Sequence, residues 1–250
     1  MKTIIVLSGV LAMCVSGANA ATDVINGNLF YGPEKGRFYN ILTPIEFDTK
    51  WQQFYLRDEF GYGITDDLTV VLSTTGSYDS SGNPEFGKWV WNDLQLGLDW
   101  SVVSQGENRA DLYARVEQVY DMRDGWDIFA YKWSLGTHFG RVTNRWTLAG
   151  LIQLDYITDD KTWYDNDAWA MTVGLFGQYL IDSRWSLIAE LDFDFDLHHE
   201  YYDGERLELE LGVNYNLGAD KYFGLYTSKD VTRDFDDAPM KFKFQFGIEF

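Results

Sequence analysis

The chain has very little cysteine, the residue whose disulfide bonds stabilise many small exported proteins. It contains one cysteine, Cys14, among 250 residues, so no disulfide can form within it and hydrogen bonding and burial must hold it together. Beyond residue 20 no run of about 18 apolar residues occurs, which excludes a transmembrane helix. Proline is also rare, and no proline- or serine-rich linker divides the chain. We therefore expect one continuous unit.

Basic residues are scarce as well. The chain has 20 Lys and Arg against 39 Asp and Glu, a formal net charge of −19 at pH 7. A chain this acidic repels nucleic acid, so no nucleic-acid partner is expected. The sequence contains no motif for a cofactor, and none is expected.

The N-terminus has the pattern of a secretory signal. Lys2 is followed by an apolar run over 4–15 and by Ala18-Asn19-Ala20, an A-x-A cleavage site. Residues 1–20 are thus predicted to be a signal peptide and residues 21–250 the exported unit. Cys14 is not expected to carry lipid, because Met13 is too large for the small residue that such a site requires.

What the sequence does have is alternation at period 2. In 94–102 and 207–217 every second residue is apolar, and 185–197 alternates over its whole length. Segments of about ten residues with this pattern, separated by turns, are typical of strands that cross a membrane in a barrel. Less regular examples lie at about 51–64, 68–79, 109–121, 127–141, 145–157, 168–181 and 220–230.

The last strand is the clearest case. One face carries Phe242, Phe244, Phe246, Ile248 and Phe250, and the other carries Lys243, Gln245 and Glu249. An edge this apolar would promote aggregation in water, whereas a closed barrel in a membrane has no edge. An even strand count requires one more strand before 51–64; 24–31 and 37–45 both qualify, and Pro44 limits the second. The predicted fold is an all-β, antiparallel, up-and-down transmembrane β-barrel of about twelve strands.

Connection lengths and aromatic positions distinguish the two ends of this barrel. Short turns at 65–67, 105–108, 143–144, 182–183 and 218–220 alternate with longer connections near 80–91, 158–167, 199–205 and 231–240, the short 122–126 being an exception. Short turns are expected on the periplasmic side. Aromatic residues predicted at the turn ends are Tyr62, Trp100, Phe139, Trp146, Tyr179, Trp185, Tyr215 and Phe250; those at the loop ends are Tyr78, Tyr120, Phe129, Tyr156, Trp169 and Phe242. Two such girdles favour a membrane barrel over a secreted β-sandwich.

The A-x-A signal, the alternating strands and the terminal Phe250 together resemble the outer-membrane β-barrel superfamily of Gram-negative bacteria, the porin-like barrels. The resemblance covers the whole chain after the signal, and the length is similar to that of twelve-stranded oligogalacturonate and nucleoside channels. It implies export through the periplasm, a place in outer-membrane lipid, and Phe250 as the signal that the barrel-assembly machinery recognises. No functional residue is carried over from those channels.

Function must come from the polar face of the strands, which points to the interior of the barrel. The predicted pore-lining residues are Asp99, Arg115, Glu117, Lys132, Asp155, Glu190, Asp192, Asp194, Asp196, Glu208 and Glu210. Acidic residues outnumber basic ones on this face, which raises the local concentration of cations. We therefore expect a passive, porin-like channel that transports small hydrophilic or cationic solutes and prefers cations.

The densest acidic cluster lies on two adjoining strands, with Glu190, Asp192, Asp194 and Asp196 on one and Glu208 and Glu210 on the next. Like charges this close need water, counterions or basic groups between them, and Arg115 and Lys132 across the lumen are candidates. A divalent-cation site built of these oxygens is the alternative. The sequence has no calcium-loop spacing, so the metal content stays unknown.

Two other function classes remain open. An outer-membrane hydrolase is the first: Asp196 and His198 have the Asp-x-His spacing that resembles omptin proteases, and Ser134 and His138 share a face, although too far apart along a strand for the direct contact that a phospholipase needs. The second is a surface-binding or structural barrel whose lumen is narrowed by Tyr55, Tyr113 and Phe176. We expect a channel and not an enzyme.

Overall fold

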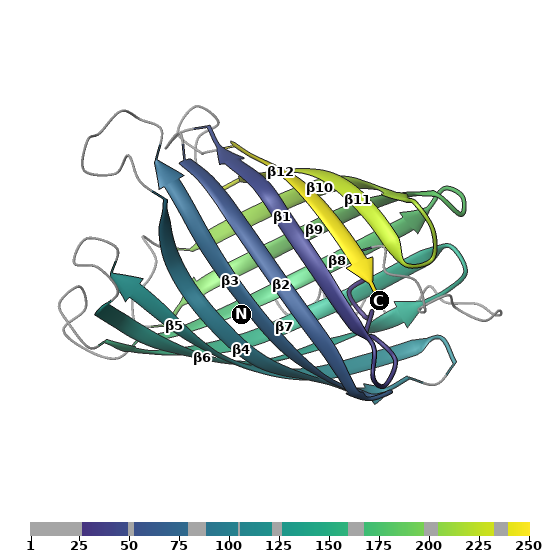
Figure 1. Ribbon diagram of the computed structural model, residues 1–250, viewed down its shortest axis with the longest axis horizontal. Helices are drawn as coiled ribbons and strands as arrows, with labels where there is room; N and C mark the ends of the chain where they lie inside the picture. Colours follow the sequence, from purple (N-terminus) through teal and green to yellow (C-terminus); the bar gives the residue numbers. More distant parts are fainter. Residues whose placement is uncertain are drawn as a thin grey trace, which may run out of the picture.

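The alternating segments form one sheet that closes on itself. The computed structural model describes residues 27–49, 53–79, 89–104, 106–121, 127–159, 168–197, 205–232 and 240–250, and in these residues twelve antiparallel strands follow in chain order round a barrel that β1 and β12 close (Figure 1). The strands are β1 (Phe38–Asp48), β2 (Gln53–Thr65), β3 (Leu68–Asp79), β4 (Val90–Val103), β5 (Asn108–Asp121), β6 (Asp127–Val142), β7 (Trp146–Asp159), β8 (Ala168–Leu180), β9 (Trp185–Asp196), β10 (Arg206–Asn216), β11 (Lys221–Asp230) and β12 (Met240–Glu249). The predicted fold is confirmed. The predicted signal peptide lies outside the described residues.

The structure decides which segment is the first strand. β1 begins at Phe38, so the candidate at 37–45 is the strand, and the described part of the candidate at 24–31 is not. β1 continues past Pro44 to Asp48, further than expected. The pairing of β1 shifts register between Leu42 and Ile45, which places Pro44 in a bulge, where a residue without an N–H donor is tolerated.

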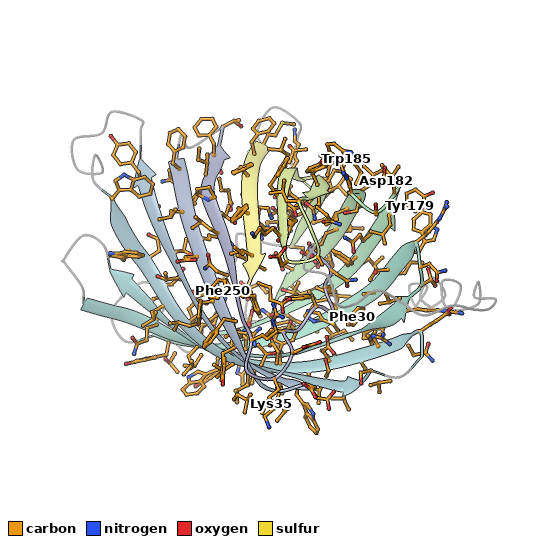
Figure 2. All side chains as sticks on the ribbon, turned by 45° about the vertical axis from the view of Figure 1, so that its right-hand side comes forward. Phe30, Lys35, Tyr179, Asp182, Trp185 and Phe250 are labelled. Atoms are coloured by element: carbon orange, nitrogen blue, oxygen red, sulfur yellow. The ribbon has the colours of Figure 1, made fainter. Side chains whose placement is uncertain are left out.

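Short connections gather at one end of the barrel, called the turn end, and the longer ones at the other, called the loop end. At the turn between β8 and β9, Asp182 accepts hydrogen bonds from the backbone N–H groups of Arg184 (2.7 Å) and Trp185 (2.8 Å), which lower the pKa of Asp182 (Figure 2). The connection at 122–126 lies outside the described residues. Short turns of this kind hold neighbouring strands in fixed register.

Aromatic rings pair across strands near both ends, as the two predicted girdles require. Trp146 packs on Tyr179 and Trp185 on Tyr215 at the turn end. Phe250 joins the same end by contacting Phe38. The rings of Tyr156 and Trp169, 4.7 Å apart, are an example at the loop end. The side chains of Tyr120 and Phe129 are outside the described set.

The outer face between the girdles is apolar and exposed, as a surface in contact with acyl chains must be. Side chains such as Leu96, Leu135, Leu148, Leu175 and Leu225 point outward and are at least half exposed. The described part of the chain contains no helix long and apolar enough to cross a membrane. An exposed apolar band on the outside of a closed sheet is typical of barrels that contact lipid.

One polar pair interrupts this outer face. Asp58, in the middle of β2, points outward and accepts a hydrogen bond from the Asn40 side chain on β1. A carboxyl group at this depth is costly in lipid. We expect replacement of both residues by leucine (N40L/D58L) to raise the free energy of unfolding by about 1–2 kcal/mol, measured by urea titration in lipid vesicles. A loss of stability in this variant would contradict contact of the pair with lipid.

Inside the barrel, tyrosine rings lie over glycines of neighbouring strands. The pairs are Tyr39 with Gly61, Tyr113 with Gly136, Tyr222 with Gly247 and Tyr226 with Gly212. A side chain in place of any of these glycines would collide with the ring, so the glycines let the rings lie flat against the wall. This layer narrows the lumen without interrupting the strand pairing.

Candidate functional site

The lumen, which is the interior of the barrel, is lined by the polar faces of the alternating strands. All the predicted pore-lining residues lie on inward-facing strand positions: Asp99, Arg115, Glu117, Lys132, Asp155, Glu190, Asp192, Asp194, Asp196, Glu208 and Glu210. Even-numbered residues of β9 and β10 point inward, because the odd-numbered Leu187 of β9 and Leu211 of β10 are exposed on the outside. The strands thus bring these charged groups to a common interior, and the role of each in a pore stays a prediction.

Ion pairs line the wall from β9 through β12 to β2, either between adjacent strands or from β10 to β12 across β11. Lys243 lies 2.8 Å from Glu210, and Lys241 lies 3.4 Å from Glu208. Arg206 contacts Asp194 at 2.9 Å. On β1 and β2, Arg57 contacts Glu46 at 3.1 Å. A small polar cavity lies among three of these pairs, and its lining includes Lys243 and Glu210, Lys241 and Glu208, and Arg57 and Glu46.

The opposite wall has its own pairs. Arg115 bonds to Asp99, and Lys132 lies 3.1 Å from Glu117. Asp155 is buried and accepts two hydrogen bonds from the amide of Gln153, each 3.0 Å long. Arg115 and Lys132 thus neutralise carboxylates on their own side of the barrel.

The acidic cluster is therefore compensated differently from the way the sequence suggested. The basic groups beside it are Arg206 on β10 itself and Lys241 and Lys243 on β12, beyond β11, while Arg115 and Lys132 pair elsewhere. The sequence prediction did not include Arg206 and Lys241 as lumen residues. Each lies two positions from a residue that the prediction placed inside, Glu208 and Lys243, and so faces the same side of its strand. The structure also places the buried acidic residues Glu46, Asp48 and Asp230 inside, so carboxylates remain in excess.

Two carboxylates in the cluster have no ion pair among the described residues. They are Glu190 and Asp192, which face inward at neighbouring inner positions of β9. One carboxylate oxygen of Asp192 is buried and lacks a hydrogen-bond partner within the described part of the chain. The basic groups Lys243 and Arg206 pair with Glu210 and Asp194 instead.

A segment ahead of β1 occupies the lumen at the turn end. Residues 27–35, called the strap, enter the barrel at the rim, where the Lys35 backbone N–H donates to Asp66 at 3.0 Å (Figure 2). Gly36, with φ +82°, forms the bend between the strap and β1, and its N–H donates to the Gly63 carbonyl. Nothing in the sequence distinguished this segment from a strand.

The far end of the strap is anchored on the opposite wall. Phe30 is buried among inward side chains of β6, β7, β8, β9 and β11, including Val142, Phe176 and Tyr226. The amide of Asn28 donates to the Thr147 hydroxyl at 3.3 Å and accepts from the Phe30 backbone N–H at 3.0 Å. The strap thus spans the lumen from one wall to the other.

Tyr31 fastens the middle of the strap. Its hydroxyl donates to Glu249 of β12 at 2.5 Å, and its ring packs edge-on against Tyr39. Burial, reinforced by the Glu249 carboxylate, raises the pKa of Tyr31 above its ordinary value, so the hydroxyl stays protonated. Glu249 also pairs with Arg37 at 2.5 Å.

A small cavity remains between the strap and the wall of β3 to β6. Its lining includes Asp66, Asp99, Asp111, Tyr113 and His138. The His138 ring lies between Phe30 and Tyr113, at centroid distances of 6.5 and 4.8 Å. The histidine thus serves in packing contacts with the strap.

Some of the side chains that a metal site or a hydrolase would need lie within the described residues. Among the described residues, no three His, Cys, Asp or Glu side chains are placed to hold a metal ion. Ser134 and His138 both face inward on β6, and the Ser134 hydroxyl has no hydrogen-bond partner in the described structure. His198, on which the protease alternative depends, lies outside the described residues.

The architecture has close counterparts among solved outer-membrane proteins. No family model matches the chain, and no curated protein matches it. The NanC porin aligns with a TM-score of 0.64 and 8% identity over 84% of this chain and 98% of that one. The KdgM porin aligns with a TM-score of 0.53 and 9% identity, over 86% and 99%. A second KdgM structure, in complex with disordered oligogalacturonate, has a TM-score of 0.52 and 7% identity, over 86% and 98%. At these identities the likeness is one of fold.

Proposed function

We propose that this barrel is a passive channel of the bacterial outer membrane that admits small hydrophilic solutes and prefers cations. The observation that carries the proposal is the contrast between the two faces of one closed sheet. The outer face is apolar, while the inner face carries charged side chains along the lumen, from Asp99 and Glu117 on one wall to Glu190 and Glu210 on the other. A polar interior inside an apolar exterior is what an aqueous path through a bilayer requires.

Cation preference follows from the excess of carboxylates. Glu190 and Asp192 supply negative charge that no basic side chain of the described residues balances by an ion pair. Fixed negative charge in a narrow lumen concentrates cations and repels anions, and the effect weakens as salt screens it. Catalysis is no part of the proposal.

The porin-like fold of its structural neighbours supports this proposal without identifying a solute. Export through the periplasm and recognition of Phe250 by the barrel-assembly machinery belong to the same proposal. In the barrel, the Phe250 backbone exchanges two hydrogen bonds of 2.9 Å with Phe38, so the terminal residue takes part in closure.

The experiment that tests the channel is single-channel recording of the refolded protein in a planar bilayer under a salt gradient. We expect discrete conductance steps and a reversal potential on the cation side at low salt, moving toward zero as salt is raised. A barrel that is correctly folded by heat-modifiability on gels and stays silent at every voltage, both as the unaltered chain and with F30A, which loosens residues 27–35 in the lumen, would refute the channel. A reversal potential on the anion side would refute the cation preference alone.

A further inference from the structure

We propose that the strap, residues 27–35, is a gate: it closes the lumen at the turn end and leaves it when the channel opens. The inference rests on the proposed channel function and adds its regulation. It is carried by where the strap lies, by how it is held and by the surface beneath it.

The strap lies across the path that a solute would take. At the rim it is bonded to Asp66 and Gly63, and 27–30 reach the opposite wall at Thr147 and Asn214. Together with the inward tyrosine layer, it fills the lumen at this level, so that Phe30 and Pro33 are almost fully buried. Beside the strap, in the described structure, lies a small cavity next to His138.

The wall is shaped to receive the strap. A side chain at Gly63 would lie 2.7 Å from the carbonyl oxygen of Pro33, and one at Gly27 would lie 2.5 Å from the Asn214 amide nitrogen. Gly27 also adopts φ +75°, a left-handed conformation that other residues rarely take. The fit is therefore specific on both sides of the lumen.

The strap is nevertheless held by contacts that can be released without unfolding the barrel. Its backbone hydrogen bonds run within the segment, as from Tyr31 N–H to the Asn28 carbonyl, or to the rim. Its contacts with the walls include the Asn28 to Thr147 hydrogen bond, the packing of Phe30 and the hydrogen bond from Tyr31 to Glu249. The strap is no part of the sheet, because the twelve strands pair with one another and close the barrel.

The surface under the strap is mixed: Phe30 covers an apolar patch that includes Val142, Phe176 and Ile188, and polar side chains lie close by. The buried inward residues near its anchored end include the polar side chains of Thr147, Gln178, Ser186, Asn214 and Asn216. Amides and hydroxyls lose little when water replaces a protein partner, whereas the apolar patch loses its burial. Gly36 provides the bend about which the strap can move, since no atom lies within 4 Å of the position its Cβ would occupy.

A reversible cross-link tests the gate. A Cβ at Gly32 would lie 3.6 Å from the Thr69 hydroxyl, so cysteines at these positions are within reach of a disulfide. The full chain carries C14S so that G32C/T69C provides the only thiols. Oxidation should consume both thiols and lower the conductance at least about tenfold, and reduction should restore it. The single variants G32C and T69C, treated identically, should show no such change.

A second variant weakens the gate. F30A removes the apolar anchor but changes no residue within a strand. We expect the fraction of time that the channel is open to rise about tenfold or more, because the strap loses the burial of the Phe30 ring. Failure of the cysteine pair to couple, or coupling that leaves conductance unchanged, would overturn the gate and leave the channel standing. A folded barrel that stays silent with F30A as well as without it would overturn the gate together with the channel.

Discussion

Replacement of Tyr222 by alanine is expected to lower the free energy of unfolding by about 3–5 kcal/mol, the range for loss of a buried aromatic ring. Tyr222 of β11 is 0% exposed, although it faces a lumen. Its ring packs against Tyr39 and lies over Gly247, and its hydroxyl donates to Gln245 at 2.8 Å. Alanine would open a cavity between β11, β12 and β1, the strands that close the barrel.

The matched control is Tyr222→Phe, which keeps the ring and removes the hydroxyl. It should cost only about 1 kcal/mol, because Gln245 still accepts a hydrogen bond from Tyr226 at 3.1 Å. Equilibrium unfolding in urea, followed by tryptophan fluorescence in lipid vesicles, measures both variants. Equal stabilities for the alanine and phenylalanine variants would mean that the tyrosine layer is loosely hydrated and not packed.

Neutralising Asp194 and Glu210 together (D194N/E210Q) is expected to shift ion selectivity toward anions. The change removes two negative charges and also releases their partners Arg206 and Lys243, which remain positive. One unit charge at about 4 Å in water changes an ion's energy by about 1 kcal/mol, or about fivefold in local concentration. The ratio of cation to anion permeability should therefore fall about fivefold or more, measured as reversal potential under a salt gradient.

The control for this experiment is E210Q/K243Q, which removes both charges of one pair. It should move the reversal potential much less, since the net charge of the lumen is unchanged. Both shifts should shrink in high salt. An unchanged reversal potential in D194N/E210Q would mean that permeating ions do not come close to Asp194 and Glu210.

The partners of the charged residues could not be predicted from the alternation. A strand displaced by two residues keeps the same faces inside and outside, yet every cross-strand neighbour changes. Glu208 and Glu210 were correctly placed inward, but their pairing with Lys241 and Lys243 depends on the alignment of β10, β11 and β12. The assignment of Arg115 and Lys132 to the acidic cluster was wrong for this reason: each bonds on its own wall.

The strap was missed for a different reason. Leu29, Phe30 and Tyr31 form an apolar run of the kind found in short strands, and an apolar residue that packs inside a lumen carries the same local signal as one that faces lipid. Residues 37–45 competed for the same role, and only pairing with β2 and β12 distinguishes them.

By itself, the sequence determined that this chain is a membrane barrel, how many strands it has, which way their side chains face and where the aromatic girdles lie. These properties follow from period-2 alternation, because lipid outside and water inside act on every residue separately. The tertiary structure alone decided which charges neutralise each other, that Pro44 sits in a bulge, and that residues 27–35 cross the lumen. Those depend on register and closure, which join residues far apart in the chain and leave no local pattern.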